Sequence, residues 1–473
     1  MNLSLEFAER KSLLVGMDGI MGGASVMVAV TIWEGWGGVQ IEYSYFLSHI
    51  EWLALILLWF LLVAACGVYE LQVASRLTWT FRALAVASST VLSIYFVVYF
   101  FSPPGSLPRV MALAQVFSLL GLIGIWRSGY VLFMSSPGFR PKILIVGAGA
   151  AGQAIARVAE RERNLPCTIV GFIDDDPAKE KKSFLHCSVL GGAKSLVKLS
   201  QDLGISEVVF AITGDIRPEL FRALLACEEQ GIRITPMSDL YEELTGRIPL
   251  EHIGGGNWHV VLPLHHPQTR TLYQVFKRLI DILVAIIGLL LFAPIFPFLA
   301  VALWIESRGP IFYRQPRLGK GGRVFQLVKL RTMIPDAESS GMRTAPQDPR
   351  VTRVGRLLRM TMVDEAPQFW NVLKGETSIV GPRPEQPELV ADLEQRIPFY
   401  RLRNAVKPGM AGWALIHQGH IQSFEEAVTR LEYDLYYIKY QSLWLDVLII
   451  LRTIGKALTL RRAERVAKGQ IIG

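Results

Sequence analysis

Two adjacent carboxylates, Asp364 and Glu365, stand in a stretch of the chain where cations, prolines and glycines concentrate, between Tyr313 and Trp413. Carboxylates can hold a magnesium ion, and one of them can attack a phosphorus centre when nearby cations lower its pKa and screen the phosphates. The pair stands among four arginines, Arg353, Arg356, Arg359 and Arg383. Adjacent acids are also common as solvated surface charge, so the pair alone favours that plainer interpretation.

Six ordered motifs surround the pair and change that interpretation. They are Lys329–Met333, Asp364–Gln368, Asn371–Gly375, Ser378–Pro384, Lys407–Ala414 and Tyr433–Lys439. Together they resemble the signature of bacterial polyprenyl-phosphate hexose-1-phosphate transferases, over about Phe276 to Thr453. The regions before them resemble the N-terminal membrane block and the Rossmann-like domain of the large members of that family.

The resemblance implies a two-step reaction. Asp364 would attack the β-phosphate of a UDP-sugar, release UMP and hold the phosphosugar covalently until undecaprenyl phosphate takes it. Glu365, together with Asp364, would bind Mg²⁺ and with it the substrate diphosphate. The residues expected to neutralise phosphate charge are Arg359, Arg383, Lys329 and Arg331. Glucose or galactose is the expected sugar, the product would initiate an exopolysaccharide, capsule or O-antigen, and the family likeness implies a homodimer.

A second set of glycines lies in the middle of the chain. Gly147, Gly149 and Gly152 follow the apolar run Ile143–Val146 and open a helical run, the setting in which a backbone approaches a pyrophosphate. Asp174 follows the next predicted strand, where a ribose-binding carboxylate would stand. The alternative is that the glycines only permit close strand-to-helix packing, so NAD or another nucleotide stays an open question.

Alternating strand-like and helix-like runs predict that residues 141–253 form a Rossmann-like α/β domain. Further strands are expected at Ile169–Ile173 and Glu207–Ile212. No catalytic constellation accompanies this region. We therefore expect it to have a regulatory or dimer-forming role.

Four apolar segments open the chain, each near the roughly 20 residues that cross a bilayer. They are about Leu13–Trp33, Trp52–Val68, Ala83–Phe101 and Val110–Ile125. The loop over residues 34–51 has neither Lys nor Arg, whereas Arg76 and Arg82 separate the second and third segments. Since positive residues are retained on the cytoplasmic side, residues 1–135 are predicted to be a four-helix transmembrane domain with both ends in the cytosol.

The last third begins with a linker over residues 254–270, followed by a mostly α-helical catalytic domain over residues 271–473. An apolar run at about 279–304 contains Pro294, which removes a helical hydrogen bond. The segment after this run is strongly basic, and exporting it would violate the positive-inside rule. We therefore expect a re-entrant helix that breaks near Pro294 and returns to the cytosolic face; a kinked spanning helix is the alternative.

Composition agrees with a membrane location. Hydrophobic residues make up 51% of the chain and charged residues 19%, against roughly a quarter charged in soluble domains. The net charge of +8 suits anionic lipid headgroups or a phosphorylated substrate, and nucleic acid is not expected. The expected location is the bacterial inner membrane, multi-pass, with the catalytic domain on the cytosolic face.

Two other classes stay open. A non-catalytic membrane scaffold or regulator of polysaccharide assembly would use the membrane block and the α/β domain, but it leaves the carboxylate pair idle. A nicotinamide-dependent sugar-nucleotide dehydratase would use the glycines, but the α/β segment has no Tyr-x-x-x-Lys pair.

Overall fold

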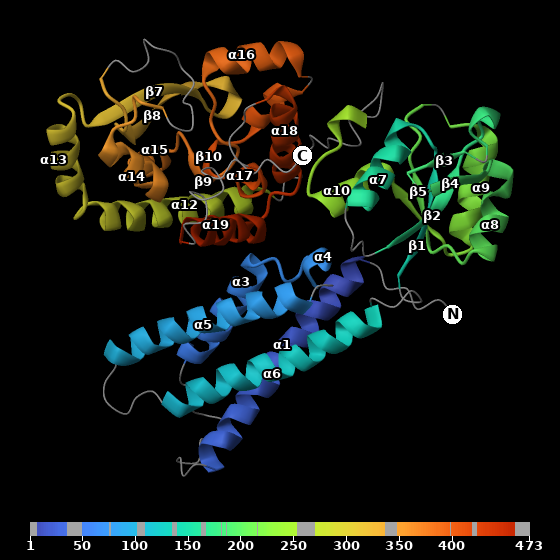
Figure 1. Cartoon of the computed structure of the whole chain (residues 1–473), viewed down its shortest axis with the longest axis horizontal. Helices are drawn as coiled ribbons and strands as arrows, with labels where there is room; N and C mark the ends of the chain where they lie inside the picture. Colours follow the sequence, from blue (N-terminus) through green and yellow to red (C-terminus); the bar gives the residue numbers. More distant parts are fainter. Residues whose placement is uncertain are drawn as a thin grey trace. The chain divides into compact units, whose positions relative to one another are not determined.

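A computed structural model gives the structure of the chain, which divides into two compact units (Figure 1). Unit 1 comprises Met1–Thr245 and Glu251–Asn257, and unit 2 comprises Gly246–Leu250 and Trp258–Gly473. The structure describes residues 7–35, 50–74, 77–101, 109–134, 140–161, 167–180, 182–185, 187–214, 216–252, 270–335, 348–397, 399–418 and 423–458. All but the last residue of the predicted linker therefore lie outside the described residues.

Each of the four predicted apolar segments is helical. The helices are α1 (Phe7–Gly35), α3 (Ile50–Ala65), α5 (Leu77–Phe101) and α6 (Arg109–Met134), with a short α4 (Leu71–Ala74) between the second and third. Among the described residues, α1, α5 and α6 are long and apolar enough to cross a membrane, whereas α3 contributes only a shorter apolar helix, Ile56–Ala65. The chain turns at residues 66–69, so the second helix begins two residues before the predicted segment Trp52–Val68 and ends three residues before its end.

A buried ion pair joins two of these helices. Asp18 of α1 and Arg127 of α6 have no exposed surface, and Nε of Arg127 donates to the carboxylate of Asp18 at 3.2 Å. Arg127 also donates to the backbone oxygen of Val68 at 3.3 Å. Breaking one partner of such a pair leaves a buried charge without compensation, so the pair holds α1 and α6 in one register.

The middle region is a mixed α/β layer built on a mostly parallel sheet with strand order β3-β4-β2-β1-β5-β6. Its strands are β1 (Lys142–Val146), β2 (Thr168–Ile173), β3 (Ser183–Phe184), β4 (Cys187–Gly191), β5 (Glu207–Phe210) and β6 (Arg233–Pro236). Its helices are α7 (Ala150–Arg161), α8 (Leu196–Asp202), α9 (Pro218–Glu229) and α10 (Met237–Thr245).

Helices cover both faces of this sheet, α7 and α10 on one and α8 and α9 on the other (Figure 1). The strands are buried on both sides because alternate residues of β1 face different cores: Ile143 and Ile145 join the first, and Leu144 and Val146 join the second. Continuous apolar runs are typical of parallel strands covered in this way. The predicted strands at 143–146, 169–173 and 207–212 correspond to β1, β2 and β5.

Unit 2 is mostly helical. Its helices are α12 (Arg270–Phe292), α13 (Phe296–Glu306), α14 (Arg353–Thr361), α15 (Gln368–Lys374), α16 (Pro387–Arg396), α17 (Trp413–His417), α18 (Phe424–Lys439) and α19 (Leu443–Leu458). Two short sheets accompany them, an antiparallel pair of β7 (Phe312–Leu318) and β8 (Val324–Leu330) and a parallel pair of β9 (Ser378–Val380) and β10 (Gly409–Ala411).

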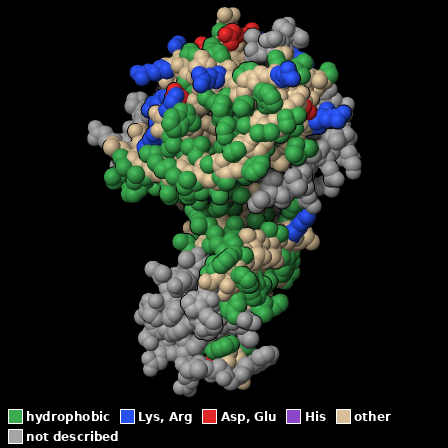
Figure 2. All heavy atoms as spheres, turned by 90° about the vertical axis from the view of Figure 1, so that its left-hand side faces the viewer, with side chains coloured by type: hydrophobic (Ala, Val, Ile, Leu, Met, Phe, Trp, Pro, Cys, Tyr) green, Lys and Arg blue, Asp and Glu red, His purple; other side chains and the backbone are tan. Residues whose placement is uncertain are grey.

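The apolar run bends at the place where Pro294 stands. Helix α12 ends at Phe292, and α13 continues at 61° to it, as a broken span or a re-entrant loop does. Large apolar side chains along both helices are exposed, including Leu290 and Phe298. Figure 2 looks onto this side of unit 2 and shows hydrophobic side chains over a broad area, with Lys and Arg side chains near its upper margin. Exposed apolar surfaces of this kind are typical of contact with a membrane or with another protein.

Candidate active site

The two carboxylates lie in a short turn between helices. Thr352 caps α14 by accepting a hydrogen bond from the N–H of Gly355, and α14 ends at Thr361 and is followed by Met362, whose φ of 57° reverses the chain. A 3₁₀ turn, Val363–Glu365, follows directly and leads into α15. A left-handed conformation at a non-glycine residue is strained, so the surrounding helices impose this turn.

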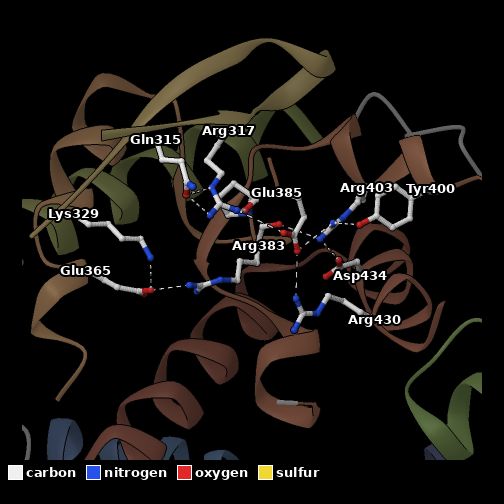
Figure 3. Close-up of polar contacts among 11 residues, drawn as sticks. Gln315, Arg317, Lys329, Glu365, Arg383, Glu385, Tyr400, Arg403, Arg430 and Asp434 are labelled. Atoms are coloured by element: carbon white, nitrogen blue, oxygen red, sulfur yellow. Dashed lines mark hydrogen bonds and ion pairs between the residues drawn. The ribbon is translucent and has the colours of Figure 1, made fainter. Parts of the chain in front are cut away.

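Two cations converge on one oxygen of Glu365. Nζ of Lys329, at the end of β8, donates to Oε1 at 3.0 Å, and Nη2 of Arg383 donates to the same atom at 2.8 Å. Figure 3 shows these two side chains reaching the same carboxylate oxygen from different directions. Oε2 accepts no hydrogen bond from any residue that the structure describes.

The neighbouring carboxylates have opposite electrostatics. Burial, and then the charge of Glu365, raise the pKa of Asp364 to about 6. Burial would also raise the pKa of Glu365, but the charges of Arg383 and Lys329 outweigh it and lower that pKa. Glu365 is therefore a permanent anion near neutral pH, whereas Asp364, only 8% exposed, titrates close to the physiological range.

The other two predicted phosphate-binding cations lie differently. Nε of Arg359 donates to Oγ1 of Thr332 at 2.8 Å, and its charge acts on Asp364. Arg331 instead donates to the hydroxyl of Ser307 at 3.1 Å and to its backbone oxygen, just after α13. Its Nε and Nη1 are buried without a hydrogen-bond partner among the described residues. The structure thus gathers Lys329, Arg359 and Arg383 near the acids and directs Arg331 toward α13.

Polar residues of α12 hold the strand that precedes Arg383. One oxygen of Asp281 accepts hydrogen bonds from the hydroxyl of Ser378 and the N–H of Ile379, both at 2.9 Å. Lys277 donates to the backbone oxygen of Val380 at 3.0 Å and to Asp446 of α19 at 3.0 Å. All three residues of β9 are therefore bonded to the helix that carries the exposed apolar surface.

The same helix reaches α15. The guanidinium of Arg278 donates to the backbone oxygens of Val372 and Leu373 at 2.6 and 2.7 Å. These are carbonyls of the last turn of α15, where a cation satisfies groups that have no partner within the helix. Asn371, on the same short helix, bonds to the backbone of β8 through Val328 and Gln326.

Arg383 follows β9 through a backbone that is packed unusually closely. A Cβ at Gly381 would collide with the backbone oxygen of Lys407, and one at Gly409 would collide with the backbone N of Gly381. Only glycine fits where two backbone segments approach each other so closely. The loop that carries Arg383 is therefore set by the β9–β10 pairing.

Sequence reasoning missed the residues that support the site. An acid within an apolar helical run is expensive unless it has a role, so Asp281 carried a usable signal. Asp434 stood within the motif Tyr433–Lys439, whereas Arg317 and Arg403, which contact the loop of Arg383, carried no signal, because no local spacing connects them.

In the middle domain, the candidate nucleotide-binding residues are largely engaged by the chain itself. Gly147 has a φ of 107°, and a Cβ at Gly152 would collide with the backbone oxygen of Gly147. The fold therefore requires glycine at both positions. The carboxylate of Asp174 accepts hydrogen bonds from the N–H of Ala148 at 2.8 Å and from Lys179 at 3.0 Å. The space beside Gly149 is open.

The donor set around the acids suits magnesium in one respect. No group of three or more His, Cys, Asp or Glu that could hold a metal occurs among the described residues. Magnesium, however, is commonly held by one or two carboxylates together with substrate phosphates. Asp364 and Oε2 of Glu365 fit that pattern.

Two family models match the chain. The one described as Bacterial sugar transferase matches residues 272–460, and the one described as PglD N-terminal domain matches residues 142–222. The first contains every residue of the site described above, and the second contains the glycine-rich strand and helix of the sheet.

Curated proteins also match the chain. The chain is 41% identical over 246 residues to a UDP-N-acetylgalactosamine-undecaprenyl-phosphate N-acetylgalactosaminephosphotransferase of Aeromonas hydrophila, covering 52% of this chain and 57% of that protein. It is 30% identical over 332 residues to a UDP-glucose:undecaprenyl-phosphate glucose-1-phosphate transferase of Xanthomonas campestris, covering 67% and 66%. A protein of the same description from Caulobacter vibrioides is 38% identical over 237 residues, covering 50% and 86%. The chain thus spans little more than half the length of the Aeromonas relative.

Proposed function

The chain belongs to the bacterial sugar transferase family, and we propose that it transfers a sugar-1-phosphate from a UDP-sugar to undecaprenyl phosphate. The products are undecaprenyl-diphosphate-sugar and UMP, and the reaction begins a surface polysaccharide. The observation that carries the proposal is the unequal pair, Asp364 with a raised pKa beside Glu365 with a lowered one, in a ring of cations.

The two acids have different tasks in this mechanism. In the first step a carboxylate oxygen of Asp364 attacks the β-phosphorus, the bond to the UMP oxygen breaks, and UMP leaves with that electron pair. In the second step an oxygen of undecaprenyl phosphate attacks the same phosphorus and releases the carboxylate. With a pKa of about 6, Asp364 is mostly ionised at neutral pH and remains a better nucleophile than an ordinary, more acidic carboxylate.

The cations offset the charge that develops on the transferred phosphoryl group. Lys329 and Arg383 both donate to Glu365, and Arg359 lies near Asp364. The positive side chains are therefore already in place beside the acids before a diphosphate binds. Glu365 and Asp364 would hold Mg²⁺ against the diphosphate. When bound, the ion would neutralise phosphate charge and orient the leaving group.

UMP release from a panel of UDP-sugars tests the proposal, with purified protein in nanodiscs, magnesium and undecaprenyl phosphate. The panel includes glucose, galactose and N-acetylgalactosamine, because the names of relatives specify the first and the last. We expect one donor to give UMP that depends on lipid phosphate and is lost in Asp364→Asn. A folded protein that is silent across the panel would instead favour the non-catalytic scaffold.

We further propose that α12 and α13 form a re-entrant helix pair, so that the catalytic domain stays on the cytosolic face of the inner membrane. The 61° bend, the exposed apolar side chains and the basic segment after α13 support it. Single cysteines at Thr271 and Arg308, in a chain freed of its four native cysteines, test it in oriented vesicles. Labelling of both from one side supports re-entry, and labelling from opposite sides supports a broken span.

The remaining proposals concern assembly. The mostly parallel sheet between layers of helices supports a Rossmann-like middle domain over residues 141–253. We also propose a catalytic domain from residue 271 and a homodimer.

NAD or another nucleotide at Gly147, Gly149, Gly152 and Asp174 would have to replace hydrogen bonds that Asp174 already makes. Calorimetric titration with NAD and UDP, comparing wild type with Gly149→Leu, tests that site, and mass photometry tests the dimer.

A further inference from the structure

The segment that carries Arg383 has little regular structure of its own. It lies between the end of β9 at Val380 and the start of α16 at Pro387. Pro382 and Pro384 have no backbone N–H, and the backbone–backbone hydrogen bonds of the segment are made by Gly381, Pro382 and Glu385, on either side of Arg383 and Pro384. The guanidinium of Arg383 nevertheless lies at hydrogen-bond distance from Glu365, 2.8 Å away. Other groups must therefore hold the backbone that carries Arg383.

Two other arginines bind the backbone of this segment. Nη2 of Arg403, in the 3₁₀ helix Tyr400–Ala405, donates to the backbone oxygen of Arg383 at 3.0 Å. Nη1 of Arg317, on β7, donates to the backbone oxygen of Pro384 at 2.9 Å. Successive carbonyls are thus held from two separate elements, as Figure 3 shows.

The next residue is held by its side chain. The carboxylate of Glu385 lies 3.7 Å from Arg317, 3.7 Å from Arg403 and 3.4 Å from Arg430. Arg403 is itself fixed, since it is 3% exposed and donates to Asp434 at 2.8 Å and to the hydroxyl of Tyr400 at 2.7 Å. A planar guanidinium can make these contacts at the same time, whereas a lysine ammonium cannot reproduce the fork.

We propose that Arg403 and Arg317 are positioning residues, which hold the backbone of Arg383 and Pro384 so that the guanidinium of Arg383 stays against Glu365 and within reach of a substrate diphosphate. This inference rests on the proposed function of the site. Neither arginine touches Glu365 or Asp364, so each acts through Arg383. A displacement of a catalytic group by about 1 Å can cost on the order of 100-fold in rate.

Arg403→Lys tests the proposal while keeping the buried positive charge. The measured quantities are kcat and KM for the UDP-sugar in UMP formation with undecaprenyl phosphate at a fixed concentration, and the affinity for UDP by calorimetry, which needs no turnover. We expect kcat/KM to fall about 10- to 100-fold, with weaker UDP binding. Arg401→Lys is the matched control: this neighbour on the same turn is 79% exposed and should change neither quantity more than about twofold.

A double-mutant cycle separates positioning from general damage. If Arg403 acts through Arg383, the variant carrying both Arg403→Lys and Arg383→Lys is no worse than Arg383→Lys alone. Costs that add in full overturn the proposal, and so does Arg403→Lys with unchanged kinetics and UDP affinity. If Arg403→Lys does not fold, the same cycle with Arg317→Lys decides. A wild type that binds UDP but releases no UMP contradicts the proposed function and leaves the UDP cycle to decide the positioning role.

Discussion

One carboxylate oxygen of Asp281, on the apolar helix α12, lies 2.9 Å from the hydroxyl of Ser378 at the start of β9. The same oxygen accepts the N–H of Ile379, and Asp281 is only 4% exposed. We expect Asp281→Ala to lower the free energy of unfolding by about 2–4 kcal/mol, because it leaves two buried donors without an acceptor. Denaturant unfolding in detergent measures this. Asp281→Asn keeps an acceptor oxygen and should cost clearly less; equal losses would contradict the hydrogen-bond explanation.

Asp364→Asn should abolish transfer and yet stabilise the fold at pH 7.5. The folded pKa of about 6 lies above the unfolded value of about 3.9, so the free energy of unfolding falls as the pH rises between these two values, and the full cost of the ionised carboxylate is present above pH 6. Removing the charge should raise the free energy of unfolding by about 1–3 kcal/mol at pH 7.5 and by little at pH 4. Thermal melts at the two pH values measure the difference.

Glu365→Gln is the matched control, and it should change the free energy of unfolding in the opposite direction. Its folded pKa is lowered, so the carboxylate stabilises the fold above its unfolded pKa and loses that contribution as the pH falls. The variant should therefore be less stable than wild type at pH 7.5. A shift of both variants in the same direction would refute the opposed electrostatics of the pair.

The rate of the first step should fall on the acid side with an apparent pKa near 6, that of Asp364. Below it, kcat/KM for the UDP-sugar should fall about tenfold per pH unit, since only the ionised carboxylate attacks. The proper quantity is kcat/KM for the UDP-sugar at a fixed concentration of lipid phosphate, because in a two-step exchange it reports the first step alone, whereas the phosphate monoester of the lipid titrates near pH 6 and affects the second step. A flat profile between pH 5 and 8 would exclude Asp364 as the titrating nucleophile.

Substitutions of Lys329 and of Arg331 should have different effects, the first on kcat/KM and the second on the melting temperature, although the same sequence motif contains both residues. Lys329→Gln should lower kcat/KM about 100-fold, because it removes a cation bonded to Glu365. Arg331→Gln should mainly lower the melting temperature, because its guanidinium contacts Ser307. Lys320→Gln, at an exposed lysine between β7 and β8, is the control. A loss for Arg331→Gln as large as that for Lys329→Gln would place Arg331 on the substrate.

The sequence allowed good prediction where the signal is local. Apolar runs located β1, β2 and β5, and Pro294 marked the bend between α12 and α13. Boundaries that depend on distant contacts were not predictable. Gly246–Leu250, assigned from sequence to the α/β domain, belongs to unit 2, where Trp413 donates to the backbone oxygen of Gly246 at 2.9 Å.

The site follows the same rule. Asp364 and Glu365 were identified because a family resemblance attaches to their motif, and their roles remain predictions. The ion pairs of Arg403 with Asp434 and of Lys277 with Asp446 join residues that are distant in sequence. Only folding brings such partners together, so neither charge patterning nor helical periodicity could indicate them.

The collision that any Cβ would cause at Gly381 or Gly409 has a consequence for sequence drift. A single substitution at either position pushes β9 and β10 apart, and Arg383 moves with them. No compensating change elsewhere can shrink a methyl group, so these two positions should stay glycine in descendants of this chain, even where the proposed donor sugar has changed. Libraries that seek new donor sugars should leave both codons untouched and diversify the side chains around them.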